Sequence, residues 1–382
     1  MGTFPGQTHT VITHRMSCDA GAVDRKDCER LMSDLNELAR RISPWLKGTG
    51  PESDIVISSR VRLARNLTHY PFTSRATEHE KREITILVRE RLRQSELTRD
   101  FEFLSIEDQG PLDRQFLVER QLISRELAGG DGPRAVAFAE DESVSIMINE
   151  EDHIRLQVME SGLALAPAWE RADKLDDALD EALQFAFHPQ FGYLTACPTN
   201  VGTGLRASVM LHLPALTITR EIERVLRTMQ KLHLAVRGLF GEGTQPSGDF
   251  YQISNQITLG RSEEDVLEEL QQMLPTVIEY ERKARQALLE NNRDELQDGI
   301  CRSLGILKSA HTITSEETMF HLSRIRLGVN LGFLDIPISI INELFMQTQP
   351  AHLQKLHGQE LGVQERNVMR ASLLREKLAD VN

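Results

Sequence analysis

The stretch that decides the fold runs from Thr195 to Pro214, with the sequence TACPTNVGTGLRASVMLHLP. Its first half joins a cysteine to a Pro-Thr-Asn turn and a Gly202-Thr-Gly204 bend. Its second half alternates apolar and polar residues at a period of two, which is typical of a half-buried strand. The glycine spacing also matches a degenerate dinucleotide-binding fingerprint, but that motif requires a helix directly after the glycines. The stretch therefore predicts a loop that enters a strand, and a Rossmann-type site is the less favoured interpretation.

The composition is that of a globular protein with an acidic surface. Of the 382 residues, 40% are hydrophobic and 26% are charged, and the formal net charge is −13. An acidic balance opposes binding to nucleic acids and to anionic membranes. No apolar run approaches the roughly 20 residues that span a bilayer, and the N-terminus lacks the layout of a signal peptide. We expect a cytoplasmic protein with no membrane and no direct nucleic-acid partner.

Short extended segments dominate the chain up to about residue 260. Alternating or compact apolar runs predict strands over 55–59, 101–104, 115–119, 134–138, 143–148, 154–158, 208–213 and 251–259. Amphipathic spacing predicts helices over 78–97, 172–187 and 219–234, the last with Thr219 as its N-cap. Because several strands follow one another without long helices between them, an antiparallel sheet is favoured over a βαβ array.

The chain changes character after Gly260. The segments 262–265 and 314–317 have the spacing of capping boxes, and helical periodicity continues to the C-terminus. Residues 1–44 are for the most part polar and aperiodic. We therefore predict an α+β fold in three parts, with a loose N-terminal tail and short helix over 1–44, a sheet domain over 45–284 and an all-helical domain over 285–382.

Arginines recur at predicted strand ends and loops. Arg60, Arg62 and Arg65 lie within six positions of an apolar run, which is unusual because strands rarely bury unpaired charge. One interpretation is a solvated face. The other is a phosphate clamp, for which the planar guanidinium is better suited than an ammonium. The chain has no Walker motif, so phosphoryl transfer would rest on positioning and electrostatics.

Carboxylates and one thiol accompany these arginines. Three acidic residues, 150–152, lie between two predicted strands, and Cys197 precedes Arg206 in the opening stretch. Acidic residues at a strand end usually face solvent, but a loop can also present them to a cleft. The alternative for Cys197 is a buried, inert thiol. The four cysteines have neither a disulfide framework nor metal-ligand spacing, so we predict no metal site in the chain itself.

Four motifs in order resemble those of the ATP:guanidino phosphotransferases, the family of the creatine, arginine and bacterial protein arginine kinases. They are SSRVR at 58–62, NEEDHIR at 149–155, CPTNVGTGLRA at 197–207 and RGLFGE at 237–242. The resemblance covers about 54–284 and implies an antiparallel sheet flanked by helices, of the guanido kinase and glutamine synthetase-like kind, with Mg²⁺ and ATP as cofactors. QISNQITLG at 252–260 and the helical C-terminal part make the chain most similar to the protein arginine kinases. The long N-terminal helical domain of the small-metabolite kinases is missing.

The resemblance also implies roles for individual residues. Glu151 and Glu242 clamp the substrate guanidinium, one of them as general base, and Cys197 lies beside it. The residues implied in nucleotide binding are Ser58, Ser59, Arg60, Val61, Arg62, Gln121, Arg155, Arg206, Ala207, Ser208, Val209, Met210, Arg237, Gly238, Leu239, Phe240, Gly241 and Glu242.

Two positions depart from the family pattern. Gln121 stands where the family usually has a histidine near the nucleotide, and we expect a weakened contact there. In the C-terminal domain, the Arg-Asp-x-x-Arg-Ala motif that binds phosphoarginine is present as Arg366, Asn367, Arg370 and Ala371. Asn367 lacks the carboxylate that pairs with a guanidinium, which puts allosteric phosphoarginine sensing in doubt.

The resemblance implies a kinase that phosphorylates exposed arginines in proteins, marking them for Clp-type proteolysis or controlling a stress-response repressor. An activator protein and a homodimer built on the C-terminal domain are implied in the same way. Two alternatives stay open. The first is a kinase of a free guanidino metabolite, and the second is a weakly active adaptor that binds phosphoarginine.

Overall fold

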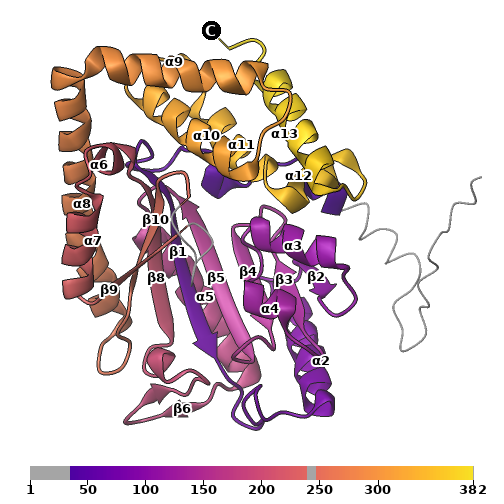
Figure 1. The fold of residues 1–382 in the computed structure, drawn as a ribbon. Coiled ribbons are helices and arrows are strands. Elements are labelled where there is room, and N and C mark those ends of the chain that lie inside the picture. The colour runs from indigo at the N-terminus through magenta and orange to yellow at the C-terminus, as the bar shows by residue number, and fades with distance from the viewer. Residues whose placement is uncertain (1–34, 239–246, 382) are drawn as a thin grey trace, which may run out of the picture.

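The computed structural model describes residues 35–238 and 247–381. Its centre is one antiparallel sheet in the order β2-β3-β4-β5-β1-β8-β10-β9 (Figure 1). The strands are β1 (Val56–Arg65), β2 (Glu102–Ser105), β3 (Ala135–Phe138), β4 (Val144–Ile148), β5 (Ile154–Ser161), β8 (Leu205–His212), β9 (Leu234–Arg237) and β10 (Phe250–Asn255). The predicted α+β class with an antiparallel sheet is confirmed.

The central strand β1 shows how the sheet separates core from site. Val61 and Leu63 are fully buried on one face, where α5 (Leu165–Leu183) packs against β1 and β5. Arg60 and Arg62 alternate with them and therefore lie on the opposite face. The register places Arg60 opposite Ser208 and Arg62 opposite Arg206, so β8 adds its own arginine to that face. Period-two alternation thus carries apolar residues to the core and guanidiniums to one surface.

Helices cover the ends and edges of the sheet. The sheet part of the chain contains α2 (Glu78–Gln94), α3 (Pro111–Glu119), α4 (Arg125–Gly129), α6 (Pro214–Ile218), α7 (Ile222–Lys231) and the short helices η1 (Pro44–Leu46) and η2 (Pro198–Asn200). The hairpin β6 (Phe187–His188) and β7 (Gly192–Tyr193) lies at the lower edge in Figure 1. The long α8 (Glu263–Asn291) leads to α9 (Arg293–Ser309), α10 (Ser315–Asn330), α11 (Ile338–Gln347), α12 (Pro350–His357) and α13 (Val363–Lys377) at the opposite end.

Several predicted elements differ from the structure. The helix predicted over 172–187 is α5, which begins seven residues earlier, at Leu165, and ends at Leu183. Residues 115–119 form the end of α3, because Pro111 starts a helix that their apolar, strand-like sequence continues. Thr219 ends α6 and caps no helix, since its hydroxyl donates to the Ala215 carbonyl at 2.9 Å, and α7 begins only at Ile222. β10 ends at Asn255, four residues early, where the Asn255 side chain binds the β8 backbone.

The helical part is joined to the sheet by a buried polar junction. Arg326 of α10 is fully buried and donates to the carbonyls of Ser53 and Asp54 at 2.7 and 3.0 Å. It also donates to Asn342 of α11 at 3.1 Å and to Nδ1 of His212, the last residue of β8, at 2.9 Å. The predicted domain boundary near residue 285 falls inside α8 and stays a prediction.

Candidate active site

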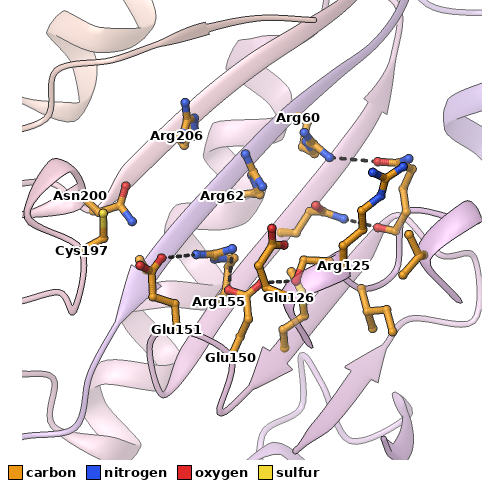
Figure 2. Close-up of a pocket in the computed structure, with 18 of the residues that line it drawn as sticks. Arg60, Arg62, Arg125, Glu126, Glu150, Glu151, Arg155, Cys197, Asn200 and Arg206 are labelled. Atoms are coloured by element: carbon orange, nitrogen blue, oxygen red, sulfur yellow. Dashed lines mark hydrogen bonds and ion pairs between the residues drawn. The ribbon is translucent and has the colours of Figure 1, made fainter. Parts of the chain in front are cut away.

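The predicted phosphate-binding arginines line one cavity of about 440 Å³ on the face of the sheet opposite α5 (Figure 2). Arg60 and Arg62 come from β1, Arg155 from β5, Arg206 from β8 and Arg237 from the end of β9. Neighbouring strands of an antiparallel sheet lie about 4.8 Å apart, so residues far apart in sequence become adjacent. The cavity is therefore a concave site dominated by positive charge.

Burial and mutual repulsion act on these guanidiniums. Burial lowers the pKa of Arg60 to about 10, with further lowering by the charges of Arg206, Arg155 and Arg237. The pKa of Arg62 lies well below its usual range for the same reasons, burial first and Arg60 next. Keeping several desolvated cations together costs free energy, which a bound polyanion would offset. The cluster thus has the electrostatics of a polyphosphate site.

Arg60 is held by neutral side chains. Its Nη1 donates to Oε1 of Gln121 at 3.1 Å and its Nη2 to Oε1 of Gln252 at 2.8 Å, while Nε donates to Ser208 at a long 3.4 Å. Gln121 has a φ of +62°, in the left-handed region. Amide acceptors orient the guanidinium without neutralising it, so its charge stays available to a phosphate.

The acidic turn between β4 and β5 supplies carboxylates to the same cavity. Glu150 is buried, pairs with Arg155 at 2.5 Å and accepts a hydrogen bond from Ser124. Glu151 pairs with Arg155 at 3.3 Å, and its side chain is 45% exposed. The two neighbours therefore differ in role. Glu150 orients Arg155, whereas Glu151 is exposed enough for an incoming cationic group to reach, as is Glu126 at the start of α4.

The Cys197 loop lies across the cavity from Arg60 (Figure 2). Cys197 is partly exposed, and its Sγ is 3.0 Å from Oγ1 of Thr199. The fully buried Asp152 accepts a hydrogen bond from the backbone N–H of Ala196 at 2.7 Å. At the other end of the loop Gly204 has a φ of +64°, and a Cβ there would lie 2.6 Å from the Ala64 carbonyl. Only glycine suits this bend between Cys197 and Arg206.

The predicted catalytic and nucleotide-binding residues lie in different parts of the structure. The structure brings Arg60, Arg62, Gln121, Glu151, Arg155, Cys197, Arg206 and Arg237 together in the cavity. A second cavity adjoins it and is lined by Ser58, Ser208 and Met210. Neighbouring strand positions hold four buried residues, Ser59, Val61, Ala207 and Val209. Gly238 directly follows β9. Leu239, Phe240, Gly241 and Glu242 lie outside the described residues.

Several lining residues were not predicted from the sequence. Ser124, Arg125 and Glu126 enter from the start of α4, and Gln157 and Gln252 from β5 and β10. Gln157 and Gln252 have one sequence signal, a polar side chain within a predicted strand, whereas Ser124, Arg125 and Glu126 have none. Among the described residues, no group of three His, Cys, Asp or Glu side chains is arranged to hold a metal ion.

The predicted phosphoarginine residues lie on α13. Arg370 is buried, and it donates to the Thr348 carbonyl at 2.8 Å, the Ile313 carbonyl at 3.0 Å and Oδ1 of Asn367 at 2.8 Å. Burial lowers the pKa of Arg370 to about 10, with Arg366 adding to the effect. Asn367 thus serves as the acceptor that the missing carboxylate would provide. Phosphoarginine binding by these residues stays a prediction.

Comparisons with known proteins agree with this geometry. Residues 83–284 match the ATP:guanido phosphotransferase C-terminal catalytic domain, and residues 293–382 match the protein-arginine kinase McsB C-terminal domain. The protein-arginine kinase of Symbiobacterium thermophilum is 49% identical over 90% of this chain and 99% of its own. That of Halothermothrix orenii is 45% identical over 91% and 99%.

Solved structures share the fold. A lombricine kinase superposes with a TM-score of 0.54 at 25% identity, over 62% of this chain and 68% of its own. A duplicated taurocyamine kinase from Schistosoma mansoni superposes with a TM-score of 0.56 at 23% identity, over 67% and 38%. None of the described helices is long and apolar enough to cross a membrane. The chain belongs to the ATP:guanido phosphotransferase family and, within it, to the protein-arginine kinases.

Proposed function

We propose that the chain transfers the γ-phosphoryl group of Mg-ATP to the guanidino group of arginine residues in proteins. The observation that carries the proposal is the single cavity in which Arg60, Arg62, Arg155, Arg206 and Arg237 face the partly exposed carboxylate of Glu151. The arginines suit a triphosphate, and Glu151 suits a guanidinium. Phosphoryl transfer needs both charges held in line, since the protein contributes by positioning and electrostatics.

The proton balance assigns Glu151 its role. A guanidinium has a pKa above about 12 and no free lone pair on nitrogen at neutral pH. As a nitrogen bonds to the γ-phosphorus, its N–H proton passes to a Glu151 carboxylate oxygen, and the bond from the γ-phosphorus to the ADP oxygen breaks. Bound Mg²⁺ would neutralise charge on the phosphates. Glu242 is the second proposed carboxylate, and Cys197 borders the guanidinium.

One labelling experiment tests the activity. The purified chain is incubated with Mg-ATP labelled at the γ-phosphate and with either an arginine-rich protein or free arginine, and acid-labile phosphate is measured on each. Label on protein arginines, located by mass spectrometry, is the expected result. Label on free arginine alone would instead identify a metabolite kinase, and phosphoarginine binding without any transfer would identify an adaptor.

The partners follow from the same proposal. Proteins with exposed arginines are the substrates, and their modification passes them to Clp-type proteolysis or inactivates a stress-response repressor in the cytoplasm. We also propose a homodimer formed through the helical domain and an activator protein that raises the kinase activity above that of the pure chain. Light scattering of the pure chain tests the dimer. Comparing the kinase activity of the pure chain with its activity in the presence of other proteins from the same cell tests the activator.

A further inference from the structure

A buried carboxylate outside the arginine-lined cavity joins α3 to the helical part of the chain. Glu119, the last residue of α3, is 4% exposed and contacts the start of α12, which packs against α3 (Figure 1). Its Oε2 accepts hydrogen bonds from the backbone N–H groups of His352 at 2.7 Å and of Ala351 at 3.0 Å. The first N–H groups of a helix have no partner within that helix. Glu119 therefore caps α12, although it lies 232 positions before Ala351.

The turn that follows Glu119 leads directly to the arginines. The backbone N–H groups of Gln121 and Leu122 return to carbonyls of α3 at 3.0 Å each, which is the pattern of a Schellman C-cap. This pattern places Gln121 in the left-handed region, with a φ of +62°, at the position where glycine is usual. A larger residue persists there only where the surrounding structure holds it. At this position the side chain has a use, because Oε1 of Gln121 accepts from Nη1 of Arg60 at 3.1 Å.

Three successive residues of this turn are fixed by different parts of the chain. Glu119 is held by α12, as described. Arg120 is buried, and its Nε donates to Oε2 of Glu142 at 2.5 Å. The carbonyl of Gln121 accepts from Nε2 of Gln157 on β5 at 2.6 Å. Glu119 is thus the link through which the position of α12 reaches the turn that holds Arg60.

We propose that Glu119 is a positioning residue, through which the start of α12 fixes the Gln121 turn and so directs the Arg60 guanidinium toward the phosphates. This inference rests on the proposed use of Mg-ATP. It adds that the helical part of the chain takes part in the geometry of the reaction, although none of its described residues lines the arginine-lined cavity.

Glu119 acts in its ionised form, because a carboxylate accepts from N–H groups more strongly than a neutral acid does. Burial raises the pKa of Glu119 to about 7, against the lowering effect of the N–H groups of Ala351 and His352, the side chain of Gln115 and the charge of Arg370. Assays at pH 8 therefore keep the carboxylate ionised in the wild type.

A double-mutant cycle at pH 8 tests the proposal. Glu119→Gln keeps the shape of the side chain but replaces one carboxylate acceptor by an N–H₂ donor, and it should lower kcat/KM for ATP by about tenfold. Gln121→Gly removes the contact with Arg60 and suits the left-handed backbone. In the Gln121→Gly chain, Glu119→Gln should lower kcat/KM by no more than about twofold, because the link to Arg60 is already broken. The same loss in both backgrounds, or no loss in either, overturns the proposal.

Asp113→Asn is the matched control. Asp113 lies near the start of α3 and pairs with Lys355 of α12, so this change weakens the same helix contact away from the Gln121 turn. It should keep kcat/KM within about twofold of its parent chain in both backgrounds. A loss as large as that of Glu119→Gln would assign the effect to helix packing and contradict a positioning role for Glu119.

A second variant decides the matter if Glu119→Gln does not fold. Glu119→Asp keeps the charge but withdraws the carboxylate by one methylene, and it should show the same dependence on Gln121 with a smaller loss. Failure of the proposed function looks different. In that case the wild type binds Mg-ATP without phosphorylating arginine, and the cycle is read from ATP dissociation constants measured by calorimetry. Losses of affinity that depend on Gln121 support the role of Glu119, and independent losses overturn it.

Discussion

At the scale of single residues, Asp152 joins the two halves of the candidate site. Its Oδ1 accepts hydrogen bonds from Nδ2 of Asn66 at 2.6 Å and from the N–H of Ala196 at 2.7 Å. Asp152 directly follows Glu151, and Ala196 directly precedes Cys197. One buried carboxylate oxygen therefore fixes the spacing between the proposed base and the Cys197 loop, although neither Asp152 nor Asn66 lines the cavity.

We expect Asp152→Ala to reduce kcat by about tenfold to a hundredfold, because a displacement of 1 Å from the reacting geometry costs this much. Its KM for ATP should stay within about twofold, since the arginines are held by other strands. Steady-state kinetics on a protein substrate separate the two constants. A rise in the KM for ATP as large as the fall in kcat, or an unchanged kcat, would show that Asp152 does not position the loop. Asp152→Asn keeps an acceptor oxygen and should be the milder change.

Glu151→Gln tests the proposed general base directly. The amide keeps the shape of Glu151 but cannot accept the guanidinium proton, so kcat should fall by about two to four orders of magnitude. Calorimetry should show little change in ATP affinity, because the ion pair of Glu151 with Arg155 is long, at 3.3 Å, and the Glu151 side chain is 45% exposed. Glu160→Gln, a partly buried carboxylate at the far end of β5, is the control. Turnover near wild type in Glu151→Gln would remove Glu151 from the mechanism.

How far the sequence predicts the site depends on the kind of residue. Arg60, Arg155, Cys197 and Arg206 stand in motifs whose residue types already suggest phosphate and guanidinium chemistry. Gln252 has no such signal, because a lone glutamine in a strand acquires its role only through the register that brings it beside Arg60. Strand register depends on tertiary packing. Contacts of this kind could not be predicted from the residues alone.

At the scale of elements, β8 joins the site to the helical domain. Its first half carries Arg206 into the cavity, and its last residue, His212, is fully buried against α10. Nε2 of His212 is 2.9 Å from the Ser323 hydroxyl, which in turn donates to Asp249 at 2.6 Å. Because Nδ1 accepts from Arg326, the imidazole is neutral and donates through Nε2. Sequence alternation predicted β8, but not that its end would be buried in a polar network.

This network predicts acid sensitivity. Burial lowers the pKa of His212 well below its usual value, and the charges of Arg326 and Arg285 lower it further. The unfolded chain then binds a proton below about pH 6.5 that the folded chain excludes. The free energy of unfolding should fall by up to about 1.4 kcal/mol per pH unit below 6.5 on account of this residue and be unaffected above it.

Urea unfolding of the wild type and of His212→Asn between pH 8 and pH 5 checks this prediction. Asparagine cannot titrate, so its variant should be less stable at pH 8 and lose less stability towards pH 5. His188→Asn, an accessible histidine of the β6–β7 hairpin, should follow the wild-type slope. Parallel slopes for the wild type and His212→Asn would show that His212 does not exclude the proton.

At the scale of the whole molecule, polar side chains of α8 join the helical part of the chain to the sheet part. Glu281 and Arg285 of α8 pair at 2.9 Å, and Arg285 also reaches Asp54 at 3.3 Å. Glu281 in turn accepts hydrogen bonds from the backbone of Ala215 and Leu216 at the start of α6. Capping boxes and periodicity predicted the helices of this region, but the buried junction needs both parts of the chain, so neither part predicts it alone.

Arg326→Ala tests whether that junction holds the molecule together. The change leaves the part-buried carbonyls of Ser53 and Asp54 and the buried side chain of Asn342 without this donor, so it should lower the free energy of unfolding by about 3 kcal/mol or more. Arg282→Ala is the matched control. Arg282 also contacts Asp54, but it is 49% exposed, and an exposed ion pair contributes only about 0–1 kcal/mol.

Urea unfolding should be a single transition, with tryptophan emission and far-UV circular dichroism coinciding, in the wild type and in Arg282→Ala. Separate melting of the helices in the wild type would contradict a single cooperative unit, and equal losses in the two variants would show that Arg326 carries no special share of the junction.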